Sequence, residues 1–227
     1  MQSPHDAPSD PSSQPIFRAP FLALLVAASM PLLFWLQTRL PDFGLSMAFR
    51  PTDLEQGRWQ GLFTSMLLHG SWMHVLMNAF GALAFGTPVA RLFARGVGPI
   101  LFLVFYIASG AIAALGYAAI HYQSDTALIG ASGAVFGLIG ASIRLVGPNG
   151  FPIGRGQGVV LLLPVNHPIV VRQALAWIAV NLVIAVVGNV PGLGGAGVAW
   201  EAHIIGLVFG LAVIGPLTRL YVKLISR

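Results

Sequence analysis

The sequence predicts an all-α integral membrane protein, a bundle of six membrane-spanning helices with both termini in the cytoplasm. Of its 227 residues, 56% are apolar and only 8% are charged, and the mean hydropathy is +0.80. About a quarter of the residues of a soluble domain are charged, so this chain lacks the polar surface that water requires. The few charges also divide the chain into six long uncharged runs, each close to or above the roughly 17–25 residues of a spanning helix.

In chain order, the six runs predict helices within 19–38, 59–90, 96–124, 126–143, 173–200 and 202–218. A further uncharged run, 156–171, is short and contains two prolines, so it predicts a loop that lies along the membrane interface. Residues 1–16 are rich in Pro, Ser, Asp and Gln and predict a disordered cytoplasmic tail. The membrane domain is then 17–225, and the absence of cysteine excludes disulfide and thiol chemistry.

The basic residues predict the orientation of this bundle. With the N-terminus inside, three of them face outward, and nine face the cytoplasm: Arg18, Arg91, Arg95, Arg144, Arg155, Arg172, Arg219, Lys223 and Arg227. Cytoplasmic loops of membrane proteins are enriched in Lys and Arg, so this asymmetry favours cytoplasmic termini. The net charge of +5 therefore reports membrane topology. The sequence predicts neither the basic groove nor the aromatic platform that would indicate a nucleic-acid partner, so none is expected.

Polar residues gather near one membrane face. In this orientation the second, fourth and sixth segments all enter from the outer side, with His69 and His74 early in the second, Ser132 in the fourth and His203 in the sixth. At 1.5 Å per residue, Ser132 and His203 both lie on the order of 10 Å below the outer rim. Equal depth is what a reacting pair requires.

These residue types suit nucleophilic catalysis. A serine hydroxyl is a poor nucleophile until a base takes its proton, and neutral imidazole is the usual base, so Ser132 and His203 are the candidate pair. Backbone N–H groups at the start of a helix could stabilise negative charge beside Ser132. His74 and Asn78 are four residues apart, share a helix face and could add donors.

No carboxylate is placed to complete a triad. Glu201 is about 200° around the helix from His203, and Asp125 belongs to an outer loop. We therefore expect a Ser–His dyad whose imidazole is oriented by packing, with Phe136, one turn below Ser132, as a packing partner. The chain has no His-Glu-x-x-His motif and few carboxylates, so no metal or other cofactor is expected.

Glycine spacing predicts how the two side chains meet. Small residues let membrane helices approach closely. The fourth segment has a face with few side chains, formed by Gly130, Gly133, Gly137 and Gly140. The sixth segment has a Gly-xxx-Gly pair one turn below His203, formed by Gly206 and Gly210. Close approach of these two segments would bring Ser132 toward His203.

Together these motifs resemble the rhomboid intramembrane serine proteases, over residues 20 to 222. The family's Gly-x-Ser-Gly matches residues 130–133. Its His-x-x-x-x-His-x-x-x-Asn matches His69, His74 and Asn78, and its Ala-His-x-x-Gly-x-x-x-Gly matches 202–210. The resemblance implies a six-helix bundle in a bacterial inner membrane that cleaves transmembrane segments of other proteins near the outer face. It implies that Ser132 is the nucleophile and His203 the base. His74, Asn78 and the backbone N–H of Ser132 are then the oxyanion donors.

The chain departs from the family pattern at two places. The Trp-Arg of the first outer loop is replaced by Gln60-Gly61, and Phe136 stands where some members have tyrosine. A non-catalytic scaffold or chaperone that binds transmembrane helices through the glycine faces is the alternative. Transport is weaker, because no charges lie at the bilayer midplane and the halves do not repeat.

Overall fold

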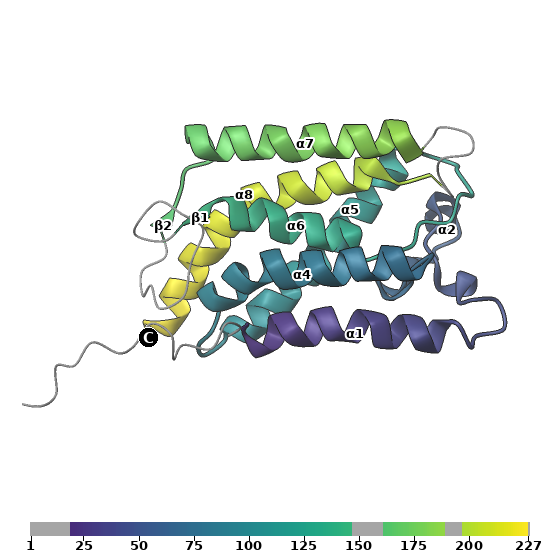
Figure 1. Cartoon of the computed structure of the whole chain (residues 1–227), viewed down its shortest axis with the longest axis horizontal. Helices are drawn as coiled ribbons and strands as arrows, with labels where there is room; N and C mark the ends of the chain where they lie inside the picture. The colour runs from purple at the N-terminus through teal and green to yellow at the C-terminus, as the bar shows by residue number, and fades with distance from the viewer. Residues whose placement is uncertain (1–18, 147–160, 189–196, 227) are drawn as a thin grey trace, which may run out of the picture.

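The computed structural model describes residues 19–146, 161–188 and 197–226. Six helices lie side by side in it (Figure 1): α1 (Phe21–Gln37), α4 (Trp72–Leu92), α5 (Gly98–Ile120), α6 (Ser132–Ile143), α7 (Pro168–Gly188) and α8 (Trp200–Ile225). Between α1 and α4 are the short η2 (Leu45–Met47), α2 (Pro51–Glu55), α3 (Gly61–Thr64) and η3 (Ser65–Leu67). Strands β1 (Leu145–Val146) and β2 (Leu161–Leu162) form one antiparallel pair. The predicted tail 1–16 and residues 156–160 of the predicted loop lie outside the described residues.

Four helices, α4, α5, α7 and α8, are long and apolar enough to cross a membrane. The other two are apolar but shorter, with 17 residues in α1 and 12 in α6. At 1.5 Å per residue α6 is about 18 Å long, well short of the roughly 30 Å hydrocarbon core. The loop that precedes α6 therefore lies in the part of the membrane that a full-length helix would otherwise cross.

Several predicted helix boundaries are wrong. In the run 59–90 the long helix begins only at Trp72, after α3 and η3, so His69 lies before α4 and not within it. In the run 126–143 the helix begins at Ser132, because Gly130 has a φ of +118° that breaks the helical path. The predicted interfacial loop ends early, since Pro168 opens α7, where proline is well tolerated. Hydropathy identifies apolar segments but does not locate the turns inside them.

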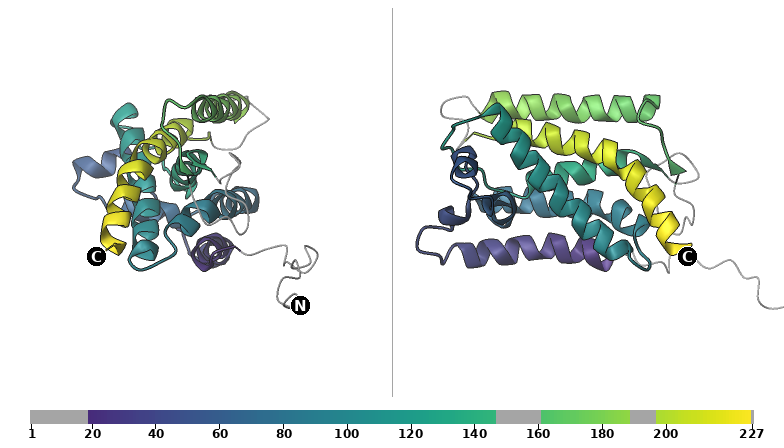
Figure 2. Two further views of the ribbon diagram at one scale, coloured as in Figure 1. Left: turned by 90° about the vertical axis from the view of Figure 1, so that its left-hand side faces the viewer. Right: turned by 180° about the vertical axis from the view of Figure 1, so that it is seen from behind.

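Helix α6 lies in the middle of the bundle, as the end-on view in Figure 2 shows. It packs against α4, α5, α7 and α8, while α1 packs on α4. The buried core around it is built from large apolar side chains, among them Phe93, Phe102, Leu138, Leu207 and Ile214. The central position of α6 places its first residue among three neighbouring helices.

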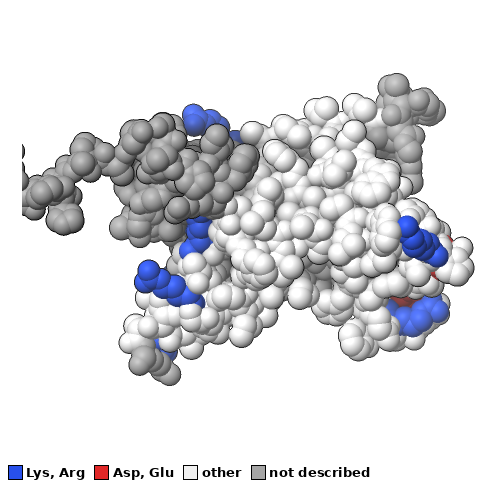
Figure 3. Space-filling model, turned by 60° about the horizontal axis from the view of Figure 1, so that its bottom comes forward, with Lys and Arg blue, Asp and Glu red and all other residues white. Residues whose placement is uncertain are grey.

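The outer surface is an apolar belt between two charged ends (Figure 3). Large apolar side chains are exposed around the helices, for example Trp35, Phe80, Ile100 and Val186. Within the described residues, every Asp and Glu lies at the end where α6 and α8 begin. Such a belt is favourable in lipid and unfavourable in water. Together with the four long apolar helices, it identifies an integral, multi-pass membrane protein.

Hydrogen bonds tie the segment between α1 and α4 to the chain that leads into α6. Phe49 and Leu128 form an antiparallel bridge with N to O distances of 3.1 and 2.7 Å. The Thr52 hydroxyl donates to Asp125 at 3.2 Å, and the Gly130 N–H donates to the Ser65 carbonyl at 2.9 Å. These contacts anchor the loop that lacks the Trp-Arg pair, and they fix the start of α6.

Candidate active site

Ser132 is the first residue of α6 and is half-buried. The turn before it requires glycine at position 130, both because of its positive φ and because an added Cβ would lie 2.8 Å from the His74 ring. The first N–H groups of a helix have no carbonyl four residues earlier within the helix to accept them. The local backbone therefore presents a hydroxyl together with free N–H donors.

His203 lies against Ser132. Its Nε2 is 2.8 Å from the Ser132 Oγ, and the residue is 8% exposed. The Phe136 ring stacks on the imidazole with centroids 4.4 Å apart and an interplanar angle of 6°. In turn, Trp177 of α7 packs edge-on against Phe136 at 6.0 Å. The structure thus brings together the three residues that sequence reasoning grouped around the reaction.

Backbone contact between α6 and α8 sets this geometry. A Cβ added at Gly206 would collide with the carbonyl of Gly133, and one at Gly210 would collide with the carbonyl of Gly137. On the other face of α6, a Cβ at Gly133 would lie 2.6 Å from Ala113. Only glycine allows the helices to lie this close, and their closeness carries Ser132 to His203.

A buried amide that the sequence analysis did not select completes the site. Asn181 of α7 is 0% exposed; its Oδ1 is 2.8 Å from His203 Nδ1, and its Nδ2 donates to the Trp200 carbonyl at 2.8 Å. The expectation that packing orients the imidazole is therefore incomplete. Glu201, in contrast, bonds to His121 at 2.8 Å.

Of the two predicted side-chain oxyanion donors, His74 lies beside the serine without a direct bond to it. A Cβ at Gly130 would lie 2.8 Å from His74 Nε2 and 3.8 Å from Ser132 Oγ, so both side chains border the same small space. Asn78 is buried and its amide donates to the His74 carbonyl at 2.9 Å. His69 packs edge-on against His74 at 5.1 Å. Neither ring nitrogen of His69 has a hydrogen-bond partner among the described residues.

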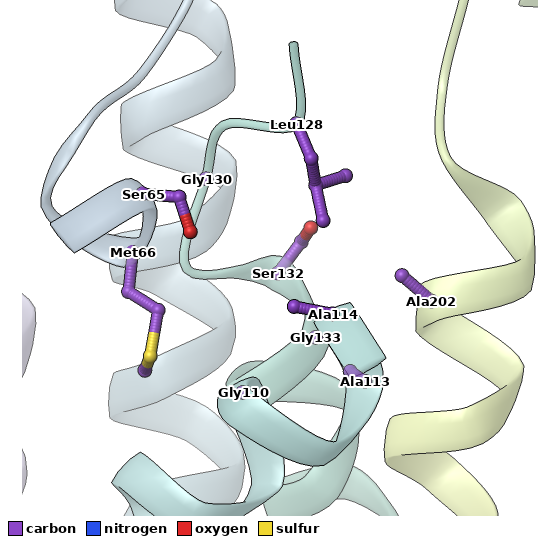
Figure 4. A pocket seen from close by; sticks show the side chains of 10 residues that line it. All are labelled: Ser65, Met66, Gly110, Ala113, Ala114, Leu128, Gly130, Ser132, Gly133 and Ala202. Carbon is purple, nitrogen blue, oxygen red and sulfur yellow. The ribbon is translucent and has the colours of Figure 1, made fainter. Parts of the chain in front are cut away.

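A narrow pocket opens beside the Ser132 hydroxyl (Figure 4). Its walls are mostly glycine, alanine and serine, and its lining residues are Ser65, Met66, Gly110, Ala113, Ala114, Leu128, Gly130, Ser132, Gly133 and Ala202. A side chain placed there has room only if it is small. Across the described parts of the chain, no three His, Asp or Glu side chains cluster as metal ligands would.

Known proteins share this sequence in part. YdcA of Bacillus subtilis (strain 168), named as a candidate rhomboid protease, is 34% identical over 90 residues, which are 40% of this chain and 43% of that protein. The rhomboid protease GluP of the same organism is 30% identical over 115 residues, 50% of this chain and 21% of GluP. The matched segments thus span less than half of either relative.

A family model covers more of the chain than either relative. The model of the Rhomboid domain matches residues 56–219. That range contains α3, η3, α4, α5, α6 and α7 and continues through most of α8. It includes every residue that lies around the Ser132 hydroxyl. The chain therefore belongs to the rhomboid family.

Proposed function

We propose that this protein is an intramembrane serine endopeptidase that cleaves transmembrane segments of other membrane proteins through Ser132 and His203. The main support is the 2.8 Å distance between Ser132 Oγ and His203 Nε2 in a membrane-embedded bundle. The protease names of YdcA and GluP are consistent with this activity.

In the proposed reaction, His203 Nε2 takes the hydroxyl proton while Ser132 Oγ attacks the scissile carbonyl carbon. The resulting imidazolium gives that proton to the leaving amide nitrogen as the peptide bond breaks. A water molecule then attacks the acyl-enzyme, His203 takes the water proton, and the released Ser132 oxygen regains it. The two side chains alone complete all four proton transfers.

Negative charge develops on the carbonyl oxygen in each tetrahedral intermediate. The backbone N–H of Ser132 is one proposed donor, because it belongs to the unpaired first turn of α6. His74 is a second, since its ring borders the space next to Ser132. Asn78 is a third: one of its two amide hydrogens is used by the His74 carbonyl, and the other remains to be donated.

His74→Ala and Asn78→Ala should each lower kcat about tenfold, and the double variant about 100-fold. Loss of one oxyanion donor can cost roughly 10²–10³ in kcat, and the remaining donors reduce that cost here. Cleavage kinetics check the prediction, with thermal unfolding as the control for folding. Parent rates in both single variants and in the double variant would contradict the oxyanion assignment.

The proposal includes an orientation in the membrane. In it, the bundle of α1, α4, α5, α6, α7 and α8 is embedded in a bacterial inner membrane, both termini are cytoplasmic, and the site opens toward the periplasmic face. The asymmetry of basic residues supports this arrangement. In this orientation the start of the short α6 places Ser132 below the outer surface of the bilayer.

The experiment that tests the function uses purified protein in liposomes with a single-span substrate. The substrate helix carries glycine or proline near its outer end, because a stable helix hides its peptide carbonyls in hydrogen bonds. We expect cleavage after a small residue such as alanine, and no cleavage when tryptophan replaces that residue, given the narrow pocket. Binding of the substrate helix without cleavage would favour the scaffold alternative.

A further inference from the structure

We infer that Asn181 is a positioning residue for His203, which holds the imidazole in the tautomer whose Nε2 can accept the Ser132 proton. The inference rests on the proposed function, and it assigns to α7 a part in the chemistry of α6 and α8. Sequence motifs of the chain do not include this residue.

The orientation of the Asn181 amide follows from its two partners. The Trp200 carbonyl oxygen can only accept a hydrogen bond, and it lies 2.8 Å from the amide nitrogen. The NH₂ group must therefore point to Trp200, which turns the amide oxygen toward His203. Exchanging the two amide atoms would place two acceptors against each other at Trp200, so the network itself selects this orientation.

The amide orientation then selects the histidine tautomer. Asn181 Oδ1 is an acceptor, so His203 Nδ1, at 2.8 Å, must carry the hydrogen. A neutral imidazole has one N–H, which leaves the Nε2 lone pair free. Nε2 faces the Ser132 hydroxyl at 2.8 Å, in the protonation state of a general base. When Nε2 takes the proton, the same amide oxygen continues to accept from Nδ1.

The position of Asn181 on α7 fits this role. Asn181 and Trp177 are four residues apart and so share one face of the helix. Trp177 packs on Phe136, which stacks on the imidazole, while Asn181 bonds to the ring edge. One face of α7 thus restrains both the plane of the ring and its rotation within that plane.

The first test measures the tautomer directly and does not depend on proteolysis. In protein labelled with ¹⁵N-histidine, protonated and bare ring nitrogens give separate signals, and the His203→Ala variant identifies those of His203. The parent should show protonated Nδ1 and bare Nε2. Asn181→Leu, which has similar volume and no hydrogen bonds, should show a mixture or protonated Nε2. An unchanged tautomer in Asn181→Leu would overturn the inference, even if the protein is a protease.

The second test uses kinetics and a conservative variant. Asn181→Leu should lower kcat about tenfold with little change in KM, since substrate contacts are untouched. This loss is smaller than the roughly 10⁴ that a wrong tautomer costs in a Ser-His-Asp triad, because leucine frees the imidazole and does not lock the wrong form. Asn181→Asp should keep kcat within about threefold of the parent, because a protonated Asp carboxyl can donate its O–H to the Trp200 carbonyl, as the amide does, and present its other oxygen to Nδ1.

Val183→Ala is the matched control on α7, since Val183 is 62% exposed and points away from the site. It should leave both the spectrum and kcat unchanged. Equal losses in Asn181→Leu and Asn181→Asp, with the parent tautomer in both, would show that Asn181 only ties α7 to α8. If the parent itself cleaves nothing while its tautomer depends on Asn181, the positioning role stands and the proposed function fails.

Discussion

Ser132→Ala is expected to abolish both substrate cleavage and labelling by a serine-directed mechanism-based inhibitor. The variant lacks the oxygen that lies 2.8 Å from His203 Nε2. His203→Ala should also abolish cleavage, because the hydroxyl then keeps its proton. In a soluble serine protease the loss of either group lowers kcat by about 10⁶-fold, and a similar loss is expected here. Gel-based cleavage and mass spectrometry of the labelled protein measure the two effects.

Matched controls exist on the same molecule. Ser142 lies on α6 as well, but its hydroxyl donates to the Ile139 carbonyl at 2.9 Å, one turn away. His167 lies just before α7, so Asn181 follows it by 14 residues, about 21 Å along the helix. Ser142→Ala and His167→Ala should retain cleavage and labelling. Cleavage that persists in Ser132→Ala and stops with a chelator would exclude the serine mechanism.

Gly206→Ala is expected to lower both stability and activity, although it adds a single methyl group. The added Cβ would collide with the Gly133 carbonyl, and a backbone atom in a packed helix cannot move aside as a side chain can. Overpacking of this kind costs about 1–3 kcal/mol. Separation of α6 from α8 also moves His203 away from Ser132, and a misplacement of about 1 Å can cost roughly 10²-fold in rate. Thermal unfolding and kcat measure the two effects.

Gly86→Ala is the control, because Gly86 is also a helix-interior glycine. Its added Cβ would meet side-chain atoms only, at 3.4 Å from Leu138 and at greater distances from Phe102 and Ala23. Alanine is the better helix former, so this variant should fold at least as well as the parent. If Gly206→Ala and Gly86→Ala behave alike, close backbone approach is not what positions the dyad.

The membrane class and the long helices could be predicted from the sequence, because helices that contact lipid are strongly apolar. Ser132 and His203 could be selected because polar residues are rare in such segments. Ser132 lies in a glycine-rich run, and His203 lies one turn before the Gly-xxx-Gly pair of α8. Both patterns are local in sequence. Helical spacing places Phe136 one turn below Ser132, and the close approach of α6 and α8 that the glycines predicted brings it onto His203.

Asn181 was missed for a physical reason. Its partners lie 19 and 22 residues away on another helix, and no spacing rule connects α7 with α8. A signal was present, because an amide in the long uncharged run 173–200 is costly unless it is paired. The start of α4 was missed for a similar reason: residues 59–71 are uncharged and continuous with the apolar run of α4, but they include α3 and η3, and Ser65 of η3 accepts a hydrogen bond from Gly130 in the loop ahead of α6.

The amide at position 181 also bears on how the protein enters the membrane. A dyad oriented by aspartate would require a carboxylate in α7, and insertion scales assign an aspartate at a helix centre about 2.5–3.5 kcal/mol. Asparagine supplies the acceptor without a formal charge, so α7 can partition into lipid before α8 arrives to pair with it. Order of synthesis then matters, since α7 leaves the ribosome before its histidine partner. In the proposed site, the residue that orients His203 is therefore one that can enter the membrane before its histidine partner is synthesised.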